Sequence, residues 1–99
     1  MVAQGVLGFQ YESDSSPWAI QVGAFSSLLQ AREIASGVHD ALADLLAAAQ
    51  IELLPTSPFG GRVMYRARLS SLSANAANTA CARLAASLQA CMVVAPGQV

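Results

Sequence analysis

Polar and adaptable side chains recur at every second position in one short stretch of this sequence. Residues 62, 64, 66 and 68 are Arg, Met, Arg and Arg, and a glutamine interrupts an apolar run at position 21. An arginine can grip a carboxylate through two parallel hydrogen bonds, a glutamine amide both donates and accepts, and a methionine can lie along the apolar face of a ring. Together these groups suit the binding of an extended sugar chain. The residues that we expect to contact such a ligand are Gln21, Met64, Arg66, Arg68 and Met92.

The same residues also have plain structural interpretations. A solvated strand face carries arginines such as Arg62, Arg66 and Arg68, and a glutamine is ordinary on an open sheet. The two methionines can equally fill gaps at the surface. Because each contact is worth only about 1–3 kcal/mol at best, a binding site needs several of them together.

Groups that serve catalysis or metal binding are not arranged for those tasks. His39 is the only histidine, and its place beside the apolar stripe of a predicted helix favours a structural or surface role. Asp40 and Asp44 belong to the polar side of that helix, where carboxylates are normally solvated. No Cys/His/carboxylate spacing fits a metal ion, and no motif places a histidine beside a cysteine. The sequence therefore predicts a binding module without enzymatic activity, cofactor or metal.

The charge balance limits the kinds of partner. Five basic and six acidic residues give a net charge of −1, whereas binding to nucleic acid or anionic membranes depends on a large electrostatic term. No apolar run approaches the ~20 residues of a membrane span. The N-terminus lacks the basic start and long apolar middle of a secretion signal. We therefore expect no nucleic-acid partner and no membrane insertion. If the domain is exported, we expect another part of a larger protein to direct it. We also expect the isolated domain to be a monomer.

The first half of the chain predicts a strand, a helix and a short edge strand. Residues 18–25 alternate, which directs Trp18, Ile20 and Val22 toward the core of a half-buried strand. Ser27 and Gln30 have the spacing of a capping box, so a helix should begin there. Its apolar face is expected to hold Ala31, Ile34, Ala35, Val38, Leu42 and Leu45. Residues 51–54 then predict an edge strand that the prolines at 55 and 58 bring to an end.

The second half predicts strand, helix, strand. Residues 62–69 alternate again, with Val63, Tyr65, Ala67 and Leu69 on the buried side. Ser73 can cap a second helix. The buried stripe of this helix is expected to contain Ala77, Ala80, Cys81, Leu84 and Leu88. Residues 91–95 predict a final strand that Pro96-Gly97 ends.

This order of elements predicts the fold class. Strand, helix, strand, strand, helix, strand is the split βαβ arrangement, an α+β, ferredoxin-like or RNP-like βαββαβ fold. It has a four-stranded antiparallel sheet with two helices on one face and leaves the other face open. Residues 1–17 mix glycine, serine and proline and predict a linker or flexible N-terminal extension, followed by the domain at 18–96 and a tail at 97–99.

The two cysteines, Cys81 and Cys91, are either a disulfide or two small buried hydrophobes. Cys81 lies on the inward stripe of the second helix, and Cys91 points inward if Met92 points outward. A disulfide between that helix and the last strand is therefore geometrically reasonable, subject to the distance limits of such bonds. It would fit an oxidising compartment.

Three segments of the chain resemble SPOR domains. Residues 18–26, WAIQVGAFS, are similar to the opening of that family, in which an aliphatic-Gln-aliphatic-Gly-small-Phe strand leads into the first helix. Residues 64–68, MYRAR, resemble its Tyr-Arg-aliphatic-Arg strand, and residues 91–94 resemble its terminal strand. Two departures stand out: Met64 occupies a position that often carries an aromatic residue, and Ala24 one that frequently carries a hydroxyl.

The resemblance implies a function and a location. SPOR domains bind peptidoglycan glycan strands that lack stem peptides, commonly as accessories to a division protein, an amidase or a D,D-carboxypeptidase, so it implies a periplasmic binding module that localises a larger cell-wall protein. Two alternatives stay open on the residues alone. An RNA-recognition-like module has the same open sheet but needs outward aromatics for base stacking, and a structural dimerisation domain would pair through the sheet or an edge strand.

Overall fold

Four antiparallel strands form one sheet in the order β2-β3-β1-β4. The computed structural model describes residues 17–58 and 60–97. The strands are β1 (Trp18–Phe25), β2 (Gln50–Thr56), β3 (Met64–Leu72) and β4 (Met92–Val94). The helices are α2 (Leu28–Ala41), the short α3 (Ala43–Leu46) and α4 (Ala74–Ala86). The α+β fold class that the sequence predicts is confirmed.

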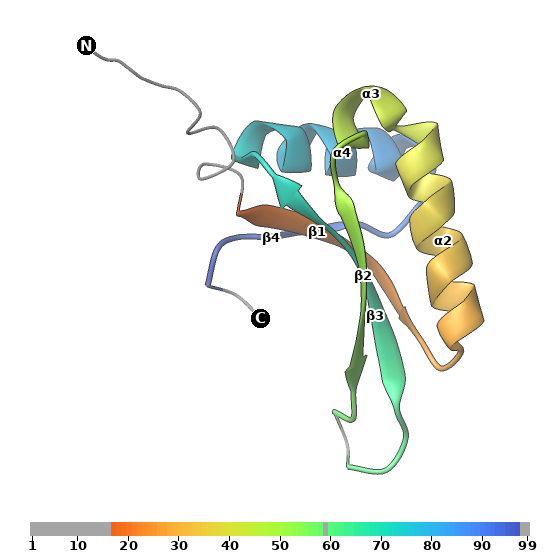
Figure 1. The fold of residues 1–99 in the computed structure, drawn as a ribbon. Coiled ribbons are helices and arrows are strands. Elements are labelled where there is room, and N and C mark those ends of the chain that lie inside the picture. Colours follow the sequence, from red (N-terminus) through yellow and green to blue (C-terminus); the bar gives the residue numbers. More distant parts are fainter. Residues whose placement is uncertain (1–16, 59, 98–99) are drawn as a thin grey trace.

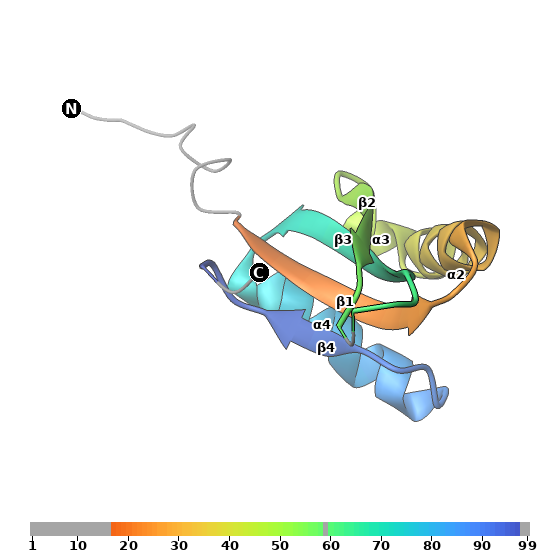
Figure 2. The same ribbon diagram turned by 90° about the horizontal axis from the view of Figure 1, so that it is seen from below.

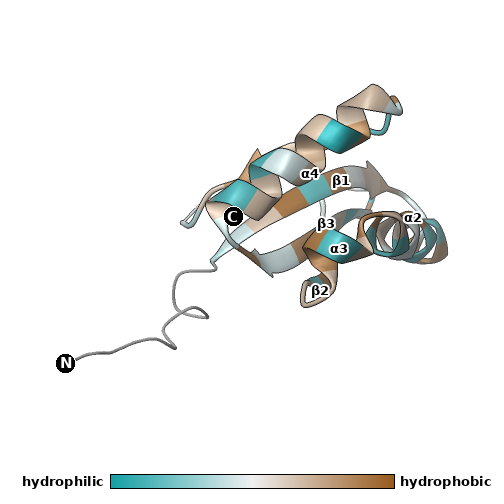
Figure 3. Ribbon diagram, turned by 90° about the horizontal axis from the view of Figure 1, so that it is seen from above, coloured by the Kyte–Doolittle hydropathy of each residue, from teal (hydrophilic) through white to brown (hydrophobic). Residues whose placement is uncertain are grey.

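The helices pack on a single face of the sheet (Figure 1). Figure 2, seen from below, shows β1 and β4 in front of α4, and Figure 3 shows brown, hydrophobic segments of β1 between α4 and α2. The largest fully buried side chains, at this sheet–helix interface, are Ile20, Leu46, Leu69 and Val22. Trp18 packs against the same cluster, as predicted from its place in the alternating pattern with Ile20 and Val22. Burial of this apolar stripe fixes the helices to one face, and no helix of the described residues covers the other.

Both long helices begin at serine caps. The Ser27 hydroxyl oxygen accepts a hydrogen bond from the backbone N–H of Gln30 at 3.2 Å, and the Ser73 hydroxyl oxygen accepts one from Ala76 at 3.0 Å. Each bond satisfies one of the backbone donors that the first helical turn leaves unpaired. Both helix starts agree with the sequence prediction.

We expect Ser73→Ala to lower the free energy of unfolding by about 1 kcal/mol, because the Ala76 N–H loses its capping acceptor. Urea unfolding followed by circular dichroism measures the change. Ser26→Ala is the matched control, since Ser26 is exposed and caps no helix. Equal stability of the two variants would contradict the capping role.

Several boundaries differ from the sequence prediction. The strand β2 continues through Pro55, which an edge strand tolerates because one side of β2 has no ladder partner among the described residues. The strand β3 extends to Leu72, and Ser71, with φ of 65°, forms an irregularity opposite β1 that returns Leu72 to the core. Val63 precedes β3 and is exposed, not buried.

Leu88 was expected in the buried stripe of the second helix, and this expectation is wrong. The helix α4 ends at Ala86, and Leu88 follows with a positive φ of 61° and a side chain that is 95% exposed. The backbone N–H of Gln89 then closes the turn by bonding to the Leu84 carbonyl at 2.9 Å. A 3.6-residue repeat applies only while the helix lasts, so the apolar residue that follows its end does not share its face.

Candidate ligand-binding face

One row of paired residues crosses all four strands on the face opposite the helices. Gln21 of β1 is paired with Arg68 of β3 on one side and with Met92 of β4 on the other, and Glu52 of β2 is paired with Arg68. Directly paired residues point to the same side of a sheet. We call the surface around this row the open face, because no helix or strand of the described chain covers it.

The centre of the open face is a hydrogen bond between two long polar side chains. The Arg68 Nε donates to the Gln21 Oε1 at 2.9 Å, and Arg68 is only 7% exposed. An arginine has donors only, so the atom that accepts must be the amide oxygen of Gln21. This fixes the orientation of the amide and leaves its NH₂ group as a donor toward a ligand. Arg68 thus holds Gln21 in place through its Nε–H.

A glycine bulge extends the open face along β1. Between Gln21 and Gly23 the register with β3 shifts, so that Gly23 is paired with Ala67 and Ala24 with Arg66. The extra residue reverses the alternation: Ala24 is exposed on the same side as Gln21, while Phe25 packs against the core. Gly23 has a φ of +151°, which side chains rarely adopt.

A groove of about 570 Å³ lies on the open face between the end of β1 and the β2–β3 hairpin. This volume falls within the usual range for small-molecule sites. Its described lining consists of Gln21, Ala24, Thr56, Pro58, Arg62, Met64 and Arg66. The surface therefore combines apolar patches with N–H donors.

The structure distributes the five expected ligand contacts over this face. Gln21, Met64 and Arg66 line the groove together. Arg68 is bonded to Gln21 from the neighbouring strand and is buried, and Met92 is 56% exposed on β4 beside Gln21. All five residues thus face the same side of the sheet, and their role as ligand contacts stays a prediction.

Four further lining residues were not among the expected contacts. Ala24 was missed because strict alternation points it inward, and Thr56 and Pro58 because they follow the predicted edge strand. Arg62 was predicted on the outward side of the strand, yet not as a contact. The glycine inside an otherwise regular strand pattern was the one available signal, since such a residue often marks a bulge.

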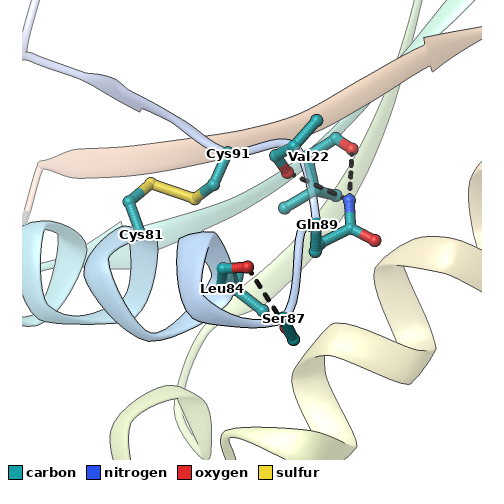
Figure 4. The surroundings of a disulfide bond; sticks show 7 residues. Val22, Cys81, Leu84, Ser87, Gln89 and Cys91 are labelled. Carbon is teal, nitrogen blue, oxygen red and sulfur yellow. Dashed lines mark hydrogen bonds between the residues drawn. A yellow bond between two sulfur atoms is a disulfide. The ribbon is translucent and has the colours of Figure 1, made fainter.

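Cys81 and Cys91 form a disulfide that ties α4 to the residue before β4, with 5.2 Å between the two Cα atoms. The predicted pairing is confirmed. In the same connection, Gln89 Nε2 donates to the carbonyl oxygens of Val22 and Ala90 at 3.0 Å each (Figure 4). Val22 is the extra residue of the bulge, so one side chain of this connection supports the backbone from which the open face is built.

The histidine and the two aspartates that were weighed as catalytic or metal-binding groups lie on the helical side. His39 Nδ1 lies 3.4 Å from Asp40 Oδ1, and Arg83 donates to Asp44 at 2.9 and 3.2 Å, which links α4 to α3. In the described residues, no three His, Cys, Asp or Glu side chains are grouped to hold a metal ion. None of the described helices has the length and apolar character to cross a membrane.

Comparisons with known proteins agree with this geometry. Residues 14–95 match the family model of the SPOR domain. Among solved structures, the chain is similar to the solution structure of the peptidoglycan binding domain of the B. subtilis cell wall lytic enzyme CwlC, with 20% sequence identity and a TM-score of 0.52 over 81% of this chain and 89% of that one. No curated protein matches the chain significantly. Since the family model covers most of the chain, this protein belongs to the SPOR domain family.

Proposed function

We propose that this domain binds peptidoglycan through its open face and takes glycan strands whose stem peptides have been removed. Membership of the SPOR domain family and the likeness to the peptidoglycan binding domain of CwlC support peptidoglycan as the ligand. The observation that carries the proposal is the uncovered row of Met92, Gln21, Arg68 and Glu52, continued by the groove.

The open face suits a strand of sugars in shape and chemistry. A polymer needs a long surface without a closing wall, and this one crosses four strands. Gln21 presents its amide NH₂ to sugar hydroxyls and acetamide carbonyls, because Arg68 occupies its oxygen. Met64 and Met92 offer polarisable apolar surface to the CH faces of the rings.

The domain's role is non-catalytic: it determines where in the cell wall the protein that carries it binds. A module that recognises peptide-free glycan brings the protein that carries it to places where amidases have acted, such as the division septum. A periplasmic location fits this role, and the disulfide, which is stable in an oxidising compartment, supports it. Peptidoglycan strands are its partner.

The alternative of RNA recognition finds no support on this surface. At the centre of the open face, β1 and β3 present two pairs of outward residues. These residues are Gln21 with Arg68 and Ala24 with Arg66, and none of them is aromatic. Bases are held chiefly by stacking on aromatic rings.

We expect the purified chain to co-sediment with amidase-treated sacculi more strongly than with untreated sacculi. The double variant Gln21→Ala, Arg66→Ala should bind the treated sacculi about tenfold more weakly or worse, because it loses a neutral and a charge-assisted donor. The matched control is Gln30→Ala, Arg32→Ala, which removes the same residue types from the exposed side of α2.

Folding of the variants is checked separately, since Gln21→Ala leaves the buried Arg68 without its acceptor. Arg66→Ala alone, which breaks no hydrogen bond of the described chain, keeps the test valid if the double variant unfolds. The proposal fails if the unaltered chain does not sediment with treated sacculi, or if folded Arg66→Ala binds as well as the α2 control.

A further inference from the structure

We infer that the groove beside the β2–β3 hairpin is a carboxylate subsite, and that it reads the free carboxylate of a muramic acid residue whose peptide has been removed. The inference rests on the proposed function and names the group within the glycan strand that the domain recognises. Arg62 and Arg66, which both line the groove, are the residues that we assign to this group.

The described polar groups of the groove are almost all donors. Arg62 and Arg66 have donors only, and neither has a hydrogen bond or an ion pair with another described residue. The amide oxygen of Gln21 already accepts a hydrogen bond from Arg68, which leaves the NH₂ group to donate to a ligand. Thr56 adds a single hydroxyl. A site of this kind calls for a ligand rich in acceptors, and a carboxylate pairs with arginine through charge-assisted, often bidentate hydrogen bonds.

Charge is unevenly distributed between the two sides of the domain. Three of the five basic residues, Arg62, Arg66 and Arg68, lie on β3 or the hairpin that precedes it. The helices carry Glu33, Asp40 and Asp44 together with the other two basic residues, Arg32 and Arg83. On the open face, Glu52 accepts a hydrogen bond from the Ser70 hydroxyl at 2.9 Å and does not line the groove. The net charge of −1 therefore conceals a local positive site that complements one anionic group.

The groove also fits a sugar that carries its acid on a short arm. Apolar surface from Ala24, Pro58 and Met64 accompanies the two guanidinium groups, so a ring and its carboxylate can be held side by side. A stem peptide attached to that carboxylate would turn it into a neutral amide and would have to leave through the groove. Loss of charge and added bulk both act against the substituted strand, which gives a physical reason for selecting peptide-free glycan.

The test changes the carboxylate on the ligand and the arginines on the protein. The chain is sedimented with amidase-treated sacculi, with the same sacculi after their carboxyl groups have been amidated with carbodiimide and methylamine, and with chitin, whose sugars carry no carboxylate. The variant Arg62→Gln, Arg66→Gln removes both charges while keeping polar side chains. Arg32→Gln on α2 removes a charge from the opposite side as a control.

We expect amidation to weaken binding of the unaltered chain about tenfold or more, and the double variant to show a similar loss on unmodified, amidase-treated sacculi. Amidation should then have little further effect on the double variant, because the two changes remove the same interaction. Binding to chitin should be as weak as binding to amidated sacculi.

Equal binding of the unaltered chain to treated and amidated sacculi would overturn the carboxylate subsite and leave the proposed function standing. A folded double variant that binds like Arg32→Gln, or stronger binding of the unaltered chain to untreated than to treated sacculi, would overturn the subsite together with the proposed binding of peptide-free strands through this face. Failure of the unaltered chain to bind treated sacculi at all would remove the proposed function and this inference with it.

Discussion

Replacement of Gly23 by alanine should destabilise the domain by about 3 kcal/mol, although it adds a single methyl group. A Cβ at this position would lie 2.5 Å from Cζ and 2.8 Å from Cε2 of Phe25, and the backbone φ of +151° is one that side chains rarely adopt. The Phe25 ring packs against the core cluster, so it cannot move away from the methyl without loss of apolar contact. Urea unfolding followed by tryptophan fluorescence measures the change.

Gly37→Ala is the matched control for this prediction. Gly37 lies on the exposed side of α2, and an added Cβ would meet nothing within 4 Å. Because glycine costs a helix roughly 0.5–1 kcal/mol relative to alanine, this variant should be more stable than the natural chain. A Gly23→Ala protein as stable as the natural one would show that the bulge does not need glycine.

The same substitution also tests the link between the bulge and ligand binding. A Gly23→Ala protein that stays folded has to relieve the contact with Phe25, and a shift of the bulge would move Ala24, which lines the groove. Binding to amidase-treated sacculi should therefore fall in the folded variant as well. Gly37→Ala, on the opposite side of the sheet, should bind as the natural chain does.

The sequence predicted the layers of this domain because its apolar periods are local and regular. Alternation in residues 18–22 and 64–69 and the 3.6-residue stripe of α2 need no knowledge of distant contacts. The serine caps were equally readable, since each acts on a backbone group three residues away. The fold class followed from the order of these elements alone.

Details that depend on register were not predictable in the same way. Ala24 lines the groove because the bulge reverses the alternation after Val22, and Leu88 is exposed because α4 ends two residues earlier. Both outcomes depend on a single backbone conformation. The bond between Arg68 and Gln21 is likewise a contact of residues 47 positions apart, so no pattern in the sequence indicated that Arg68 supports its neighbour.

Loss of the disulfide should lower the free energy of unfolding by about 2–3 kcal/mol. The bond closes a loop with a sequence separation of 10 residues, and without it the unfolded chain gains the corresponding entropy. Both Cys81→Ala, Cys91→Ala and the natural chain reduced with dithiothreitol should show a lower urea midpoint. Agreement between these two samples separates the cross-link from the packing of the sulfur atoms.

Loss of the disulfide should affect the strand β4 more than the other strands. It has three residues, and among the described strands it pairs with β1 alone, through Ala19 with Val94, Ile20 with Val93 and Gln21 with Met92. Such a short edge strand opens easily unless something else holds it, and the disulfide fixes the residue just before it. Reduction should therefore accelerate amide hydrogen exchange in β4 and in Gln21 more than in β2 or β3, and weaken binding through the displaced Met92. Uniform acceleration across all four strands, with unchanged binding below the unfolding transition, would mean that the cross-link stabilises the whole domain without holding the edge of the open face.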